Sequence, residues 1–60
     1  MQGGGGIRPR WKDPDGRIYE WDYQEGHVEV YNRRGRHQGA FDPQTGRKIK
    51  SADPKRRVEP

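Results

Sequence analysis

The sequence contains no cysteine, so it offers neither a disulfide framework nor a thiolate metal cluster. It has no apolar run near the roughly 20 residues that a membrane-spanning helix needs, and no apolar segment typical of a signal peptide. Only 25% of the 60 residues are hydrophobic, which leaves a thin core, because domains of this size bury only about 60% of their unfolded surface. We therefore expect one small soluble domain of marginal stability, without a membrane span, whose export information lies elsewhere if it is exported.

Positive charge, by contrast, is abundant. Thirteen lysines and arginines oppose nine acidic residues, which gives a net charge of +4. This balance favours a polyanionic partner such as nucleic acid, or an acidic protein, although a basic surface is also compatible with simple solvation. Two basic clusters, one at a turn and one near the end of the chain, suit phosphate contacts whose affinity falls with salt. Their members are Arg33, Arg34, Arg36, Arg47, Lys48, Lys50, Lys55, Arg56 and Arg57.

Glycine divides the chain into segments. Four successive glycines predict that residues 1–6 form a flexible linker and that residues 7–60 form the domain. Further glycines with turn-forming neighbours lie at Gly16, Gly26, Gly35 and Gly46. Short strands are expected between these turns, at residues 17–22, 27–32, 37–42 and 47–50, after an extended piece at 7–12. We therefore predict a mainly β fold, a small twisted antiparallel meander with an extended N-terminal leader and C-terminal tail.

The segment from Tyr19 to Tyr31 alternates polar and apolar residues with a period of two, which places successive side chains on opposite faces of a strand. With a four-residue loop at residues 23–26, one face of the hairpin carries three facing pairs: Asp22 with His27, Glu20 with Glu29, and Ile18 with Tyr31. The other face carries Trp21 with Val28 and Tyr19 with Val30. We expect this second face to pack, with Trp11, Trp21 and Phe41 in the core.

The first face carries groups suited to acid and base chemistry. Two facing carboxylates do not both ionise readily, so Glu20 opposite Glu29 is expected to raise one of the two pKa values and create a general base. A carboxylate beside His27 favours the imidazolium form, which donates a proton. An acid, a base and nearby cations are what RNA cleavage through its 2′-hydroxyl requires, without metal or cofactor. DNA lacks this hydroxyl and would not be cut by this route.

Several features of this face have more than one interpretation. Alternating acids and a histidine also occur on the wet face of an ordinary hairpin. A metal site built from Asp22, His27, Glu29 and His37 is conceivable, although the spacing matches no established ligand signature. The charged tail, residues 51–60, either is solvated or folds back and brings a cation to the acidic face. Tyr31 shares that face and is placed to stack on an unpaired base.

Two classes without catalysis also fit the composition. In an RNA- or ribosome-binding module, the basic segments would dock on the nucleic acid and the acids would only hold the hairpin in register. In a protein-interaction domain, the acidic and basic faces would meet a protein partner. Salt-sensitive binding without a cleaved product favours the first class, and a tight protein complex without RNA binding favours the second.

Short motifs in a fixed order resemble the C-terminal ribonuclease domain of cloacin and the related ribosome-inactivating colicins. They are Gly3-Gly4-Gly5-Gly6, Arg10-Trp11, Ile18-Tyr19-Glu20-Trp21-Asp22, Phe41-Asp42-Pro43, Thr45-Gly46 and Asp53-Pro54-Lys55-Arg56. The resemblance implies a toxin module, of this family or of another bacterial competition toxin, that cuts the 16S RNA of the small ribosomal subunit at the decoding site. It also implies a twisted antiparallel sheet, metal-independent chemistry, an acidic immunity protein, and a longer toxin chain upstream. Such a toxin is secreted by its producer and acts in the cytoplasm of the target bacterium.

The resemblance also implies roles for individual residues. By position, the family's catalytic aspartate, glutamate base and essential arginine match Asp22, Glu29 and Arg56. The residues expected to contact RNA are Tyr19, Tyr31 and Lys50, which match the family, and the adjacent basic residues Lys55 and Arg57. The match of Tyr19 conflicts with the packing face that the alternation gives it.

One position departs from the family pattern. The family's catalytic histidine falls on Glu25, whereas His27 stands where the relatives carry glutamate. Three interpretations follow: His27 replaces the missing acid, Glu25 serves as a carboxylic acid of raised pKa, or the variant is weak or inactive. By alternation His27 shares a face with Glu29. We favour His27, because an imidazole near its own pKa is the easier proton donor at neutral pH.

Overall fold

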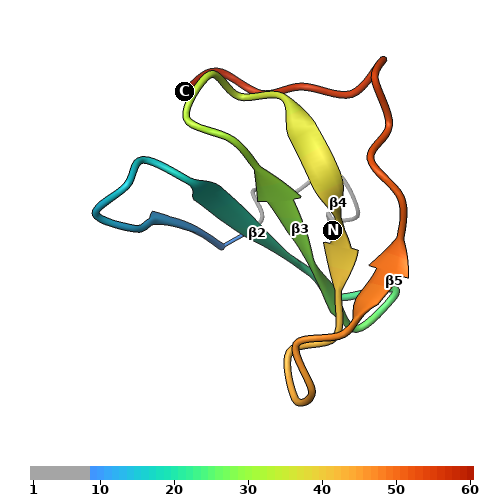
Figure 1. Ribbon diagram of the computed structural model, residues 1–60. Helices are drawn as coiled ribbons and strands as arrows, with labels where there is room; N and C mark the ends of the chain where they lie inside the picture. Colours follow the sequence, from blue (N-terminus) through green and yellow to red (C-terminus); the bar gives the residue numbers. More distant parts are fainter. Residues whose placement is uncertain (1–8) are drawn as a thin grey trace, which may run out of the picture.

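The computed structural model describes residues 9–60, which form one antiparallel sheet of five strands (Figure 1). The strands are β1 (Arg10–Lys12), β2 (Ile18–Asp22), β3 (His27–Tyr31), β4 (His37–Phe41) and β5 (Lys48–Lys50). Each strand pairs with the next one along the chain. The predicted meander is confirmed, whereas the predicted linker at residues 1–6 lies outside the described residues. Within the described part of the chain, no helix is long and apolar enough to cross a membrane.

The connections share one capping device. An aspartate or asparagine at the end of a strand, or just after it, accepts two backbone N–H groups of the following turn through its Oδ1 atom. The residues that do so are Asp13, Asp22, Asn32 and Asp42. Each of these turns also contains a glycine with a positive φ angle. Residues with a side chain rarely adopt this backbone conformation. Because the capping residue and the glycine are both recognisable in the sequence, the strand ends could be predicted closely.

The central hairpin has the predicted register. Asp22 pairs with His27, and Glu20 pairs with Glu29. The four-residue turn between β2 and β3 is closed by a 2.8 Å hydrogen bond from the Gly26 N–H to the Asp22 carbonyl oxygen. A one-residue slip would have moved the acids to the other face of the sheet. The register therefore determines which side chains can form a common site.

The buried face of the sheet is the polar one, whereas the aromatic face was expected to be buried. The polar face is the enclosed one: Ile18 and Tyr31 are each 1% exposed, and the acids and histidines beside them are also buried. The face that was expected to pack is an open groove, in which Trp11 is 48% exposed. The assignment of Trp11 to the core is wrong, because the short edge strand β1 leaves it at the rim, stacked on Tyr19 at 5.6 Å.

The C-terminal tail encloses the polar face. Residues 51–60 leave β5 and run back to the turn between β3 and β4 (Figure 1). Arg57 forms a β-bridge with Arg36, and the Val58 N–H donates to the Gly35 carbonyl oxygen at 2.8 Å. Gly35 has φ 85°, and a Cβ there would collide with the Val58 carbonyl oxygen, so only glycine lets the tail lie this close. Of the two expectations for the tail, folding back is the one that holds.

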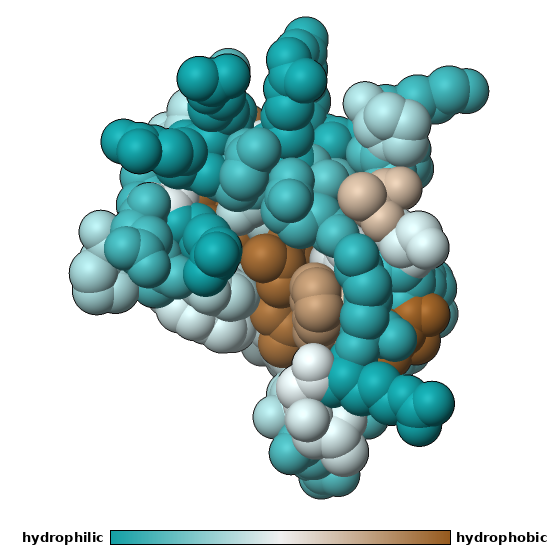
Figure 2. Space-filling view, viewed as in Figure 1, coloured by the Kyte–Doolittle hydropathy of each residue, from teal (hydrophilic) through white to brown (hydrophobic). Residues whose placement is uncertain are grey.

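The surface reflects the scarcity of apolar residues. In Figure 2 a small hydrophobic patch is surrounded by hydrophilic side chains, many of which extend outward. The hydrophobic residues that are buried are only Ile18, Val30, Tyr31 and Ala40 among the residues described. With so little apolar surface available, buried polar contacts must account for much of the order on the enclosed face.

Candidate active site

The carboxylate of Glu29 lies at the centre of the enclosed face, in the middle of β3. His27, two residues earlier on the same strand, places its Nε2 atom 2.7 Å from Glu29 Oε2. His37, at the start of β4, places its Nε2 atom 2.6 Å from Glu29 Oε1. The alternation of β3 and the pairing of Tyr31 with His37 bring these side chains to one face. Both oxygens of the carboxylate therefore have an imidazole partner.

Asp22 joins this group from the end of β2. Its Oδ1 atom accepts the Gln24 and Glu25 N–H groups of the turn, at 3.0 and 3.2 Å. Its Oδ2 atom lies 3.8 Å from His27 Nε2. The turn thus fixes the carboxylate while one oxygen faces the imidazole. The Nε2 atom of His27 thus lies near one carboxylate oxygen of Asp22 and one of Glu29.

Arg56 reaches the same carboxylate from the tail. Its Nη1 atom lies 3.6 Å from Glu29 Oε1, and its guanidinium lies over the Tyr31 ring, 6.0 Å from the centroid. The backbone holds this position, because the His37 N–H donates to the Arg56 carbonyl oxygen at 3.1 Å. The tail therefore brings a cation to the acidic face, as one of the two expectations proposed.

The environment keeps Glu29 ionised. Burial by itself raises the pKa of Glu29, because the charged form loses water. Hydrogen bonds from His37 and His27, together with the charge of Arg56, outweigh that effect, so the pKa of Glu29 lies below that of an ordinary glutamate. The carboxylate is thus ionised at neutral pH. It is held by hydrogen bonds from two imidazoles and is shielded from solvent.

The expected repulsion between Glu20 and Glu29 does not raise the pKa of Glu29. Arg10 of β1 places Nη2 2.7 Å and Nε 3.2 Å from Glu20 Oε2, a two-pronged contact that compensates the charge of Glu20. Each of the two acids has a cationic or imidazole partner from another strand or the tail, which the facing pair alone does not reveal. The pKa of Glu29 is consequently lowered, not raised.

Glu25 does not join the group. It lies in the exposed turn after β2, and its Oε1 atom is 3.6 Å from Lys50 Nζ. Its side chain is 54% exposed, against 3% for His27. Of the two residues considered for the family's histidine role, His27 is therefore the one beside Glu29.

The predicted RNA-contacting residues are dispersed. Tyr19 lies on the opposite face of the sheet, and its hydroxyl donates to Asp13 Oδ2 at 2.8 Å. Tyr31 is on the polar face but buried beneath Arg56, so the expected stacking of its ring on a base does not fit this structure. Lys50, Lys55 and Arg57 are all exposed.

A model of the Cytotoxic family matches residues 1–59. The chain belongs to this family. It is 53% identical to cloacin and 52% identical to colicin E6 and colicin E3, all from Escherichia coli, over 97% of its own length. It spans 11% of the length of each of these relatives. The family predicted from the ordered motifs is therefore confirmed.

His37 was predicted only as a conceivable metal ligand, and not as a member of the acid and base site of this Cytotoxic domain. His37 is buried, and its ring meets the Tyr31 ring edge to face at a centroid distance of 5.3 Å. A signal was present, since His37 begins the strand expected after the hairpin. However, the register between β3 and β4 shifts between Val30 and Tyr31. Because of this irregularity, alternation alone does not predict which side chains of β4 face Glu29.

The Cytotoxic domain also contains one group of potential metal ligands among the residues described. One ligand atom from each of Asp22, His27 and Glu29 can be chosen so that all three lie within 4.8 Å of one another. One nitrogen and two oxygens would suit zinc. The 2.7 Å separation of His27 and Glu29 is nevertheless that of a hydrogen bond, and Arg56 already provides a cation beside Glu29. The arrangement thus suits proton transfer better than metal binding.

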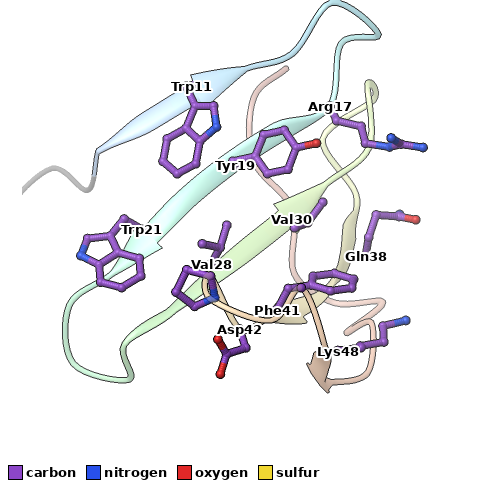
Figure 3. A pocket seen from close by; sticks show the side chains of 12 residues that line it. Trp11, Arg17, Tyr19, Trp21, Val28, Val30, Gln38, Phe41, Asp42 and Lys48 are labelled. Atoms are coloured by element: carbon purple, nitrogen blue, oxygen red, sulfur yellow. The ribbon is translucent and has the colours of Figure 1, made fainter.

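The opposite face of the Cytotoxic domain carries the open aromatic groove (Figure 3). Its volume is about 700 Å³, and its lining includes Trp11, Tyr19, Trp21, Phe41 and Lys48. Lys48 Nζ lies 5.8 Å from the centre of the Phe41 ring. The groove contains none of the acidic and histidine residues that surround Glu29. It is therefore separate from the candidate active site, which occupies the other side of the sheet.

Proposed function

We propose that this Cytotoxic domain is a toxin endoribonuclease that cleaves 16S ribosomal RNA of the small subunit at the decoding site and so blocks translation. The observation that carries the proposal is the arrangement around Glu29, with an imidazole at 2.7 Å and a guanidinium at 3.6 Å. A base, an acid and a cation in contact are the groups that transesterification through a 2′-hydroxyl requires. Membership of the Cytotoxic family supports the same class of activity.

In the proposed reaction, Glu29 accepts the proton of the 2′-hydroxyl, whose oxygen attacks the adjacent phosphorus. The bond from phosphorus to the 5′-oxygen breaks, and protonated His27 donates its proton to that leaving oxygen. Arg56 stabilises the negative charge that develops on the phosphoryl oxygens. Asp22 keeps a carboxylate oxygen 3.8 Å from His27 Nε2, where it faces the imidazole during the transfer. The products are a 2′,3′-cyclic phosphate and a 5′-hydroxyl end, and no metal or cofactor takes part.

Access to Glu29 involves Arg56. The Glu29 side chain is only 3% exposed, whereas that of Arg56 is 38% exposed and long enough to move. In our proposal the guanidinium swings from Glu29 toward the scissile phosphate when RNA binds. The same movement uncovers the base and places the cation on the reacting group. Tyr31, beneath Arg56, supports the guanidinium and does not itself stack on RNA.

The proposal includes partners and location. The domain acts as the end of a longer toxin chain, consistent with its covering 11% of each relative. That toxin is secreted by its producer and acts in the cytoplasm of the target bacterium. Exposed Lys50, Lys55 and Arg57 contact phosphates of the small-subunit RNA. A cognate immunity protein with an acidic surface complements the net charge of +4 and keeps the producer safe.

The decisive test uses the isolated domain and bacterial ribosomes. Primer extension along the 16S RNA is expected to stop at a single new end in the decoding region, and Glu29→Gln should not produce it. Chelators should leave the cleavage unchanged. Intact 16S RNA after incubation with a folded domain, free of immunity protein, would overturn the enzymatic proposal.

The burial of Glu29 and His27, each 2% exposed, favours one alternative, a ribosome-binding module without catalysis. In that case the polar cluster only holds β3, β4 and the tail together. Binding to ribosomes would then fall steeply with salt, with no new RNA end at any enzyme concentration. Conversely, a new RNA end that disappears with Glu29→Gln excludes this alternative.

A further inference from the structure

The His37 side chain connects three separate parts of the fold. Its Nε2 atom lies 2.6 Å from Glu29 Oε1 on β3, and its Nδ1 atom accepts the Asp53 N–H of the tail at 2.9 Å. Its ring also meets the Tyr31 ring edge to face at 5.3 Å. The His37 backbone adds a contact, because its N–H donates to the Arg56 carbonyl oxygen at 3.1 Å. One buried residue thus touches both the proposed base and the segment that carries the proposed cation.

The contacts define the tautomer of His37. A backbone N–H is a donor only, so the Nδ1 atom that receives it must carry a lone pair. The proton of the neutral ring is therefore on Nε2, where it points at Glu29 Oε1. Both ring nitrogens are then occupied, one as a donor and one as an acceptor. A His37 ring in this state orients its neighbours and has no lone pair left for taking a proton from RNA.

We propose that His37 is a positioning residue that sets the geometry between Glu29 and Arg56. Its Nε2–H fixes the rotation of the Glu29 carboxylate, so that Oε2 faces His27. Its Nδ1 anchors the tail at Asp53, and the Asp53 carbonyl oxygen accepts the Arg56 N–H at 3.0 Å. The tail is thereby held at the distance at which Arg56 reaches Glu29. The catalytic consequence rests on the proposed function, whereas the anchoring does not.

Two substitutions separate the two halves of this role. In His37→Gln, the side-chain amide nitrogen can replace Nε2 as a donor to Glu29, but the acceptor for Asp53 is lost. In His37→Asn, the side-chain oxygen can replace Nδ1 as the acceptor for Asp53, but the donor to Glu29 is lost. Each variant keeps a polar side chain that satisfies one of the two partners, Glu29 or the Asp53 N–H, which limits the cost to stability. Circular dichroism is used to choose a temperature and buffer in which both variants are folded.

The first measurement uses the unmodified domain and needs no activity. Long-range proton–nitrogen NMR of the imidazoles should show that the His37 ring is neutral, with an unprotonated Nδ1 and a protonated Nε2. The Asp53 amide should be protected from hydrogen exchange. A proton on Nδ1 in the folded domain, or an Asp53 amide that exchanges as in an unfolded peptide, overturns the proposal.

The second measurement compares the variants. His37→Gln should accelerate amide exchange at Asp53 and Arg56 at least tenfold, while His37→Asn should leave it near the wild-type rate. On ribosomes, His37→Asn should lower kcat by about 10²-fold, as expected when a reactive group is misplaced by about 1 Å, with KM nearly unchanged. Wild-type kcat in His37→Asn, or wild-type exchange in His37→Gln, contradicts the proposed role. If the wild-type domain does not cleave ribosomal RNA, the proposed function is refuted but the anchoring role of His37 is not. The tautomer and amide-exchange measurements test that role without activity.

Discussion

Arg56 Nη1 lies 3.6 Å from Glu29 Oε1, so the last segment of the chain completes a cluster built on the central strand. The sheet alone supplies the carboxylates and the imidazoles, whereas the cation comes from the tail. The tail is held at Gly35, Arg36 and His37, all near the start of β4. Formation of the site therefore depends on tail docking as well as on strand pairing.

Glu29→Gln tests the base. We expect cleavage to fall by about 10²- to 10⁴-fold, the range for loss of a general acid or base, because an amide does not accept the 2′-hydroxyl proton. The shape of the side chain is kept, so the fold should be retained. Its amide oxygen can accept the His37 Nε2–H, and its NH₂ group can donate to the Nε2 atom of a neutral His27. Single-turnover cleavage of ribosomes measures the effect, and an active Glu29→Gln domain would assign the base elsewhere.

His27→Ala and Glu25→Gln form a matched pair for the acid. His27 lies within the buried cluster, whereas Glu25 is exposed in the turn beside Lys50. We expect His27→Ala to lower kcat by about 10²-fold or more and Glu25→Gln to lower it less than about threefold, since an exposed ion pair contributes little. Both variants are compared at the same pH in the ribosome assay. If Glu25→Gln is the more damaging change, the turn supplies the proton.

Arg56→Ala tests charge stabilisation. Arg56 contacts Glu29 in the free domain and is proposed to meet the phosphate during the reaction. We expect a loss of kcat of about 10²- to 10³-fold, with ribosome affinity reduced much less, because the other exposed cations still bind phosphate. Arg57→Ala is the comparison: its exposed side chain is proposed only to contact phosphate, so its loss should weaken ribosome affinity and leave kcat near the wild-type value. Equal losses of kcat and affinity in Arg56→Ala would indicate docking alone.

Much of the fold was predictable because its signals are local. Each turn has an aspartate or asparagine cap followed by a glycine, and the hairpin register follows from the alternation of acids with apolar residues. The grouping of Asp22, His27 and Glu29 follows from that register. Arg56 was brought in by the family motifs and not by local pattern. The preference for His27 over Glu25 also agrees with where the structure places them.

The remaining features depend on long-range packing. Nothing local indicates that the tail covers the polar face, and without it the aromatic face appeared to be the core. Trp11 is exposed because no element covers the groove within residues 9–60. His37 could not be placed because the β3–β4 register shifts next to Tyr31. Alternation shows which residues share a face, but burial of that face is decided by segments distant in sequence.

Acid stability should depend on Glu29. Its pKa is lower in the folded domain than the value of about 4.3 for an unfolded glutamate. The stability from its contacts is therefore fully present above about pH 4.3 and is lost as the pH falls through the folded pKa. Denaturant unfolding at pH 7 and pH 3 should show a larger loss for wild type than for Glu29→Gln, whose side chain does not titrate. Equal losses would show that Glu29 is not the linked group.

The reversal of the two faces gives a prediction about stability. Ile18 is 1% exposed on the polar face, whereas Trp11 is 48% exposed at the rim of the groove. Ile18→Ala should lower the free energy of unfolding by about 2–5 kcal/mol, the range for a buried aliphatic side chain. Trp11→Ala removes a larger side chain but should cost less, roughly 1 kcal/mol, mostly from lost stacking on Tyr19. Urea denaturation followed by circular dichroism measures both. If Trp11→Ala is the more destabilising change, the aromatic face is the core of the domain after all, and the groove must close in solution.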